Sequence, residues 1–89
     1  MTGSEVDHGS PTPVYIQVAQ QIAADIERGA LAVDRRIPSE WDLVGRFGVA
    51  RETVRKAIQR LRDQGLVYTV DKRGTYVRDR SADQGAEEE

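Results

Sequence analysis

The residues best suited to chemistry in this chain are basic and polar side chains in the segment 40–59, EWDLVGRFGVARETVRKAIQ. Arg51, Arg55 and Gln59 are spaced at i, i+4 and i+8, so on a helix they form one ridge. An arginine guanidinium can pair bidentately with O6 and N7 of guanine, and basic side chains attract phosphate. These residue types therefore predict contact with a nucleic acid. The competing interpretation is an ordinary solvated helix face.

Catalysis and metal binding have few candidate residues. The 89 residues include no cysteine, and the one histidine, His8, lies in a segment rich in Gly, Ser, Thr and Pro. Glu40 and Asp42 lie at the start of a predicted helix, where capping and the helix dipole explain them better than acid–base catalysis. No glycine-rich phosphate loop precedes a helix. We expect no enzyme activity, no catalytic or metal-binding residue and no cofactor.

The net charge of −2 hides a basic middle between acidic ends. Residues 46–80 hold ten basic and four acidic side chains, and residues 81–89 hold four acids and no base. A basic segment favours a polyanionic partner. No apolar run approaches the ~18 residues of a membrane span, and the N-terminus lacks the basic-then-apolar pattern of a signal peptide. We therefore expect a cytoplasmic protein with no membrane partner.

Apolar residues at helical spacing predict three helices, over residues 14–28, 39–47 and 51–64. The second helix opens at Ser39, which forms a capping-box-like pair with Asp42 three residues later. The third helix buries one apolar stripe and turns its polar side chains outward. These outward residues are Arg51, Glu52, Arg55, Lys56, Gln59 and Arg62.

Two β-prone runs around the polar turn 71–74 predict a hairpin after the third helix. Three helices followed by a hairpin is the order of a winged helix-turn-helix, an α+β fold that is mainly α. We assign this domain to residues 13–78. Residues 1–12 have little to bury and predict a disordered arm, and residues 79–89 predict a disordered acidic tail.

The turn between the second and third helices has the features of a helix-turn-helix. Gly48 turns the chain, and Val49 is placed to fill the angle between the two helices. In such a motif the second of the paired helices enters the major groove of DNA with its N-terminus first. The third helix of this chain would therefore be the one that meets DNA.

Short motifs across residues 13–77 together resemble the DNA-binding domain of GntR-family transcription regulators. Each motif is weak alone, but their order and spacing over 65 of the 89 residues are highly specific. The resemblance implies a winged helix-turn-helix that binds operator DNA, usually as a dimer on a palindromic site. The matching residues are Pro13-x-Tyr15-x-Gln17, Ile26-x-x-Gly29-x-Leu31, Pro38-Ser39-Glu40, Asp42-Leu43, Phe47-Gly48-Val49, Arg51-x-Thr53-Val54-Arg55-x-Ala57, Leu61, Gly65-Leu66-Val67 and Gly74-Thr75-Tyr76-Val77.

The resemblance implies roles for residues of the third helix. Arg51 and Arg55 match recognition-helix residues that reach bases and nearby phosphates, and Thr53 matches a phosphate contact. Glu52 either accepts a hydrogen bond from cytosine N4 or only favours the helix N-terminus. The DNA-binding candidates from the second and third helices are Ser39, Glu40, Arg51, Glu52, Thr53, Arg55, Lys56 and Gln59.

The hairpin supplies the remaining candidates. Lys72, Arg73 and Gly74 match the tip of the wing, which in the family approaches the minor groove. Glycine permits close approach of the backbone, and cations suit the negative potential of that groove. A charged hairpin tip without function is the alternative.

Three residues depart from the family pattern. Ala50 stands where Ser or Thr is common, which predicts a missing helix cap. Trp41 stands where Arg is common, which removes a phosphate contact, and we interpret its indole as half-buried packing. Asp34 replaces a loop glycine, a change that we interpret as structural.

The leading interpretation is a sequence-specific transcription regulator, acting as a repressor, that binds double-stranded DNA. Helix 51–64 would read the major groove and the wing 71–74 the minor groove or backbone, with a homodimer at least on DNA. Family members usually add a larger effector-binding domain, which the eleven residues after Arg78 are too few to form. The chain is therefore either a fragment of a longer protein or a short stand-alone regulator, and its initial Met and natural-looking tails favour the second slightly. In either case we expect it to bind no small-molecule effector. The alternative is a winged-helix module that binds another protein, without sequence-specific DNA binding.

Overall fold

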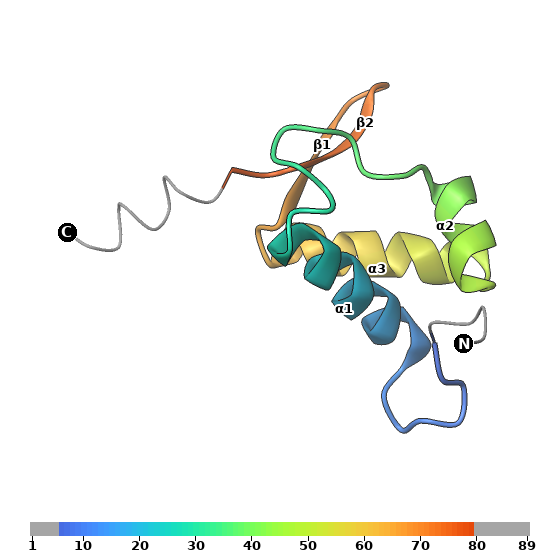
Figure 1. Ribbon diagram of the computed structural model, residues 1–89. Helices are drawn as coiled ribbons and strands as arrows, with labels where there is room; N and C mark the ends of the chain where they lie inside the picture. The colour runs from blue at the N-terminus through green and yellow to red at the C-terminus, as the bar shows by residue number, and fades with distance from the viewer. Residues whose placement is uncertain (1–5, 80–89) are drawn as a thin grey trace.

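The computed structural model describes residues 6–79, in which three helices are followed by a two-stranded antiparallel sheet (Figure 1). The predicted winged helix-turn-helix is therefore confirmed, and each helix ends within a residue of its predicted boundary. Residues 1–5 of the predicted arm and 80–89 of the predicted tail lie outside the described residues. The elements are α1 (Val14–Glu27), α2 (Glu40–Phe47), α3 (Arg51–Asp63), β1 (Val67–Val70) and β2 (Gly74–Val77).

The core lies where α1 crosses α3 (Figure 1). Each helix presents one apolar stripe: Val18 and Ile22 of α1 are fully buried, as are Val54 and Leu61 of α3. Burial of a Val, Leu or Ile side chain stabilises a fold by about 1.5–3 kcal/mol, so these stripes fix how α3 is rotated about its axis. The opposite face of α3 is consequently left to solvent.

Helix α2 begins with a capping box and ends at a left-handed glycine. The Asp42 amide donates to Ser39 Oγ (3.1 Å), and the Ser39 amide donates to Asp42 Oδ2 (3.4 Å), as predicted. Gly48 has φ of 66°, which glycine adopts without steric cost, and Val49 packs against the core at the turn. Ala50 precedes α3 without a side-chain cap, also as predicted.

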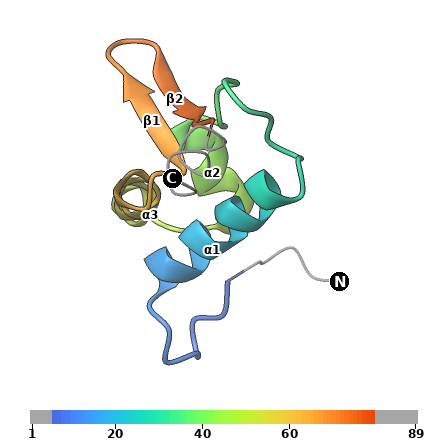
Figure 2. The same ribbon diagram turned by 90° about the vertical axis from the view of Figure 1, so that its left-hand side faces the viewer.

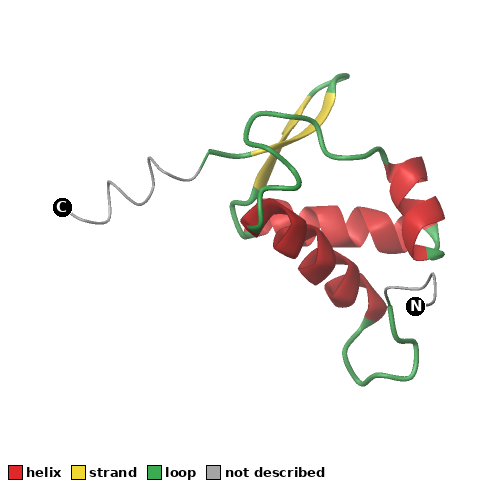
Figure 3. Cartoon of the chain, viewed as in Figure 1, coloured by secondary structure: helices red, strands yellow, loops and turns green. Residues whose placement is uncertain are grey.

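The loop between α1 and α2 runs beside the hairpin and pairs with it (Figures 2 and 3). The Ile37 amide donates to the Thr75 carbonyl (2.8 Å), and Arg36 forms an isolated β-bridge with Tyr76. Asp34 adopts φ of 62° and accepts a hydrogen bond from the Tyr68 hydroxyl (3.0 Å), which raises the pKa of Tyr68. Asp34 therefore adopts the left-handed backbone that favours glycine, and its carboxylate ties this loop to β1.

Residues 6–12 differ from the sequence-based expectation of a disordered arm. Val6 is buried in the core cluster. The Gln17 side chain accepts a hydrogen bond from the Asp7 amide (2.7 Å) and donates to the carbonyls of Asp7 (2.9 Å) and Thr12 (2.8 Å). One amide side chain on α1 thus satisfies several backbone groups of this segment, which composition alone does not reveal.

A buried carboxylate joins the end of α1 to α2. Asp25 is 5% exposed and contacts Arg46 Nη1 (2.8 Å) and Arg28 Nη2 (2.6 Å). Burial raises the pKa of Asp25, but the hydrogen bonds and charges of Arg46 and Arg28 outweigh it, so the net pKa lies below the ordinary 3.8. The cluster holds α2 in place relative to α1.

Among the described residues, no helix is long and apolar enough to cross a membrane.

The lowered pKa of Asp25 predicts how stability depends on pH. The Asp25 charge stabilises the folded state above about pH 4, and this contribution is lost as the pH falls through the lowered pKa. Asp25→Asn should lower the free energy of unfolding at pH 7 by about 1–3 kcal/mol. When the free energy of unfolding from urea titrations is plotted against pH, the variant should also lose less stability on the acid side of the curve (the acid limb) than the wild type. Asp71→Asn, in an exposed turn, should keep the wild-type limb. An unchanged acid limb in Asp25→Asn would contradict this assignment.

Candidate nucleic-acid interface

An open groove of about 760 Å³ lies between the hairpin, the N-terminal end of α2 and the face of α3 that runs from Arg51 to Arg62. Its wall includes six cationic side chains and two acidic ones, Glu40 and Asp71. A concave, positively charged surface attracts polyanions and concentrates them near its wall. The cations are Arg36, Arg51, Arg55, Arg62, Lys72 and Arg73.

The groove brings together seven of the eleven predicted site residues, from three separate elements. The other four lie outside it. Glu52 is exposed at the first turn of α3 and Thr53 is half-buried, whereas Lys56 and Gln59 lie on the flank of α3 near Tyr15. The seven groove residues are Ser39, Glu40, Arg51, Arg55, Lys72, Arg73 and Gly74.

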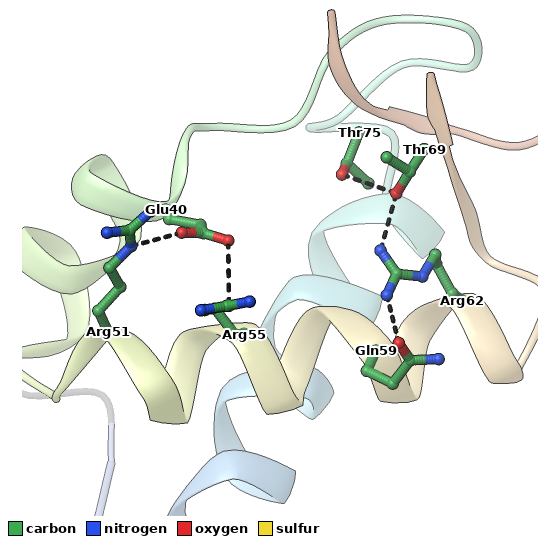
Figure 4. A network of polar contacts seen from close by, with 7 residues as sticks. All are labelled: Glu40, Arg51, Arg55, Gln59, Arg62, Thr69 and Thr75. Carbon is green, nitrogen blue, oxygen red and sulfur yellow. Dashed lines mark hydrogen bonds and ion pairs between the residues drawn. The ribbon is translucent and has the colours of Figure 1, made fainter. Parts of the chain in front are cut away.

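Glu40 holds the two arginines of the predicted ridge (Figure 4). Arg51 Nε donates to Glu40 Oε1 (2.7 Å), and Arg55 Nε lies 3.9 Å from Glu40 Oε2. The Arg51 guanidinium also lies over the Trp41 ring, 5.1 Å from its centroid. The hydrogen bond to Glu40 uses Nε of Arg51, so within residues 6–79 its two Nη groups have no hydrogen-bond acceptor and remain available as donors on a residue that lines the groove.

A second polar network joins α3 to the hairpin (Figure 4). Arg62 donates from Nη1 to Thr69 Oγ1 (2.8 Å) and from Nη2 to Gln59 Oε1. Thr69 Oγ1 in turn lies 3.2 Å from Thr75 Oγ1 on the paired strand. Gln59 also donates to Asp63 (2.9 Å), so it supports Arg62 instead of lining the groove. This chain of contacts fixes the distance between the helix and the wing.

The turn between β1 and β2 presents its cations on strained backbone. Lys72 has φ of 66° and Gly74 has φ of 132°, so the turn needs left-handed residues at both positions. A Cβ atom on Gly74 would lie 2.6 Å from Arg36 Cδ, closer than atoms approach without a clash. Glycine is therefore required here by both its backbone conformation and its neighbour.

Sequence reasoning did not assign several residues of the groove wall, among them Arg62, Arg36 and Trp41. Arg62 was placed on the outward face of α3 but not in the site, and Arg36 lies in a loop without helical or strand periodicity. Trp41 was expected to be half-buried, but it is 65% exposed, because Leu43 and Phe47 form the buried side of the short α2. Two sequence features could have indicated that Arg36 and Arg62 belong to the site: the adjacent basic residues Arg35 and Arg36, and the position of Arg62 on the outward face of α3. Within the described part of the chain, no group of three or more His, Cys, Asp or Glu residues could hold a metal ion.

Comparison with known proteins identifies transcription regulators that are similar to this chain. The family described as "Bacterial regulatory proteins, gntR family" matches residues 14–77. The HTH-type transcriptional repressor NagR of Bacillus subtilis is 39% identical over 72 residues, which cover 81% of this chain and 30% of NagR. The histidine utilization repressor of Klebsiella aerogenes is 40% identical over 68 residues, 76% of this chain and 28% of that protein. The chain thus spans about 30% of the length of these relatives.

Solved structures share the fold over most of the chain. The AraR DNA-binding domain in complex with operator ORX1 matches with a TM-score of 0.75 and 40% identity, covering 86% of this chain and 99% of that domain. YtrA from Sulfolobus acidocaldarius, a GntR-family transcription factor, matches with a TM-score of 0.79 and 32% identity, covering 97% of this chain and 90% of YtrA.

The contact between Glu40 and Arg51 should contribute little to folding. Both side chains are partly exposed, at 32% and 52%, and ion pairs in such positions are worth about 0–1 kcal/mol. Glu40→Gln should therefore lower the free energy of unfolding by less than the neighbouring Ser39→Ala, which removes a helix cap worth about 1 kcal/mol. Urea unfolding of both variants checks this order. A larger loss in Glu40→Gln would make Glu40 a structural residue.

Proposed function

This chain belongs to the gntR family of bacterial regulatory proteins, and we propose that it is a transcription regulator that represses genes by binding specific double-stranded DNA sequences. The observation that supports this most directly is the groove with six cationic side chains between α3 and the wing. Duplex DNA has the matching chemistry, because its regularly spaced phosphates release counterions when cations bind them. The relatives NagR and the histidine utilization repressor are named as repressors.

We assign base reading to the N-terminal half of α3. The major groove is about 12 Å wide and admits a helix. The AraR domain, which has the same fold, has been solved in complex with operator DNA, and this supports duplex DNA as the ligand. Arg51 and Arg55 would pair with guanine through the donors that Glu40 leaves available. Glu40 itself would lie at the DNA surface, where it would keep the two guanidinium groups oriented.

The remaining predicted residues would position the protein on the DNA backbone. Thr53, Lys56 and Gln59 do not line the protein groove between α3 and the wing. With α3 in the major groove of DNA, we expect these three side chains to meet the phosphates at the edge of that groove. Ser39 caps α2, whose free N-terminal amides also favour a phosphate. Glu52 would either favour the N-terminus of α3 or accept a hydrogen bond from cytosine N4.

The wing would approach the minor groove or its phosphates. Lys72 and Arg73 are exposed at the turn, and Gly74 would take part through its backbone, since the Arg36 stem fills the space where its Cβ atom would lie. The network from Arg62 to Thr75 would keep the wing at a fixed distance from α3, so that both elements engage the duplex at once. A fixed distance between two contacts lowers the ordering cost of binding.

A homodimer on a palindromic operator would complete the specificity. One recognition helix reaches only about half a turn of major groove, and a genome offers about 10⁶ or more competing sites. Two copies would double the number of bases that are read. The protein would act in the cytoplasm, associated with the nucleoid when bound to its operator.

Selection from a random duplex pool at near-physiological salt tests this function. The wild-type chain should enrich a palindrome. Arg51→Ala with Arg55→Ala should bind that palindrome at least 100-fold more weakly, because a bidentate arginine–guanine pair contributes about 1–3 kcal/mol of discrimination. The double variant should keep the circular dichroism spectrum of the wild type, since both side chains are exposed.

The outcomes separate the two interpretations. Enrichment of a single half-site would mean that a monomer reads DNA and that the dimer proposal is wrong. Binding that vanishes with rising salt and enriches no sequence would reduce the contact to electrostatics. In that case, retained binding of a partner protein by the double variant would identify a protein–protein module instead.

A further inference from the structure

The loop before α2 acts as a short third strand of the wing. The Asp34 amide donates to the Val77 carbonyl (2.8 Å), and the Val77 amide donates to the Arg35 carbonyl (3.0 Å). Arg36 then pairs with Tyr76 in an isolated antiparallel bridge. Because these backbone bonds flank Arg36, its Cα atom is fixed to the hairpin as firmly as a strand residue.

The side chain of Arg36 is also held in place. Its Nη1 donates to the carbonyl of Arg73 in the wing turn (3.0 Å). Its Cδ and Cγ atoms pass directly beneath Gly74, where a Cβ atom would lie at 2.6 Å and 3.2 Å from them. The Arg36 side chain therefore extends from the loop before α2 to the turn of the wing, where its guanidinium lies beside Arg73. It lines both the main groove and a smaller hollow of about 430 Å³ with Lys72, Arg73 and Tyr76.

The charge of Arg36 is not neutralised within the described residues. The carbonyl that it contacts is uncharged, and over residues 6–79 no carboxylate lies within ion-pair distance of its guanidinium. Asp71 lies in the same turn of the wing as Arg73 and also lines the groove, but it makes no ion pair with Arg36. A guanidinium has five donors, so several remain directed at solvent after the contact with Arg73.

We propose that Arg36 binds a phosphate group of the DNA backbone beside the wing. The inference rests on the proposed DNA-binding function and adds a contact from a loop outside the helix-turn-helix and the hairpin. Arginine matches phosphate geometry with two donors, and a side chain already held in place loses less entropy on binding. Gly74 serves this contact, because it leaves room for the arginine stem to pass.

Substitution of two adjacent arginines in the full chain tests the proposal. Binding is measured on the selected duplex and on an unrelated duplex, at several salt concentrations. Arg36→Ala should weaken binding to both duplexes by the same factor, about tenfold. It should also reduce the slope of log K against log salt by about 0.9, the loss of one phosphate contact. Arg35→Ala removes the same charge from an exposed neighbour that does not line the groove, and it should change both quantities less.

A double-mutant cycle with Gly74 controls for a change in folding. Gly74→Ala should lower Tm more in the wild-type background than in the Arg36→Ala background, because the clash requires the arginine stem. Equal losses of Tm in the two backgrounds would show that Arg36 does not lie beneath Gly74, and the proposal would fail.

The binding results distinguish the proposal from the function on which it rests. Equal effects of Arg36→Ala and Arg35→Ala on both duplexes would overturn the contact while leaving DNA binding intact. A loss confined to the selected duplex would overturn it as well, since it would indicate base reading. A wild-type chain that binds neither duplex would overturn the proposed function itself, and the phosphate contact with it.

Discussion

The packing of one face of α3 against α1 is the constraint on which the rest of the structure depends. Val54, Ala57 and Leu61 are fully buried, so α3 has no freedom to rotate about its axis. Its cationic face is therefore directed at the groove by apolar contacts on the opposite side. The same packing places the hairpin, because β1 follows α3 after a short turn at Gly65. Hydrophobic burial thus sets the direction of the charges.

A wall of six cations would repel itself, and the fold limits that cost with polar contacts that leave the positive potential in place. Arg62 is held by hydroxyl and amide oxygens and Arg36 by a carbonyl, which are neutral acceptors. Glu40 is the exception, since one carboxylate orients two arginines. The groove consequently keeps a net positive charge while Arg36, Arg51 and Arg62 are held in place by hydrogen bonds. Side chains that are ordered before binding lose less entropy when a ligand arrives.

Features set by local sequence could be predicted, and features set by long-range pairing could not. The helices follow apolar spacing, the Ser39 capping box spans four residues, and the hairpin surrounds one turn. The ion pair of Asp25 with Arg46 joins residues 21 apart, and the Arg36 contact with Arg73 joins residues 37 apart. Neither leaves a periodic signal. Trp41 was misjudged because an apolar residue type was taken to indicate burial, although the first turn of α2 projects beyond the core.

The most direct test of the account is whether duplex DNA occupies the groove between α3 and the wing. Trp41 is the only tryptophan of the 89 residues, lies on the groove wall and is 65% exposed, so its fluorescence reports on this surface alone. Acrylamide quenching of the tryptophan emission should be strong in the free protein and weak once the selected duplex is bound to saturation. Equal quenching with and without saturating duplex would mean that DNA binds another face of the molecule.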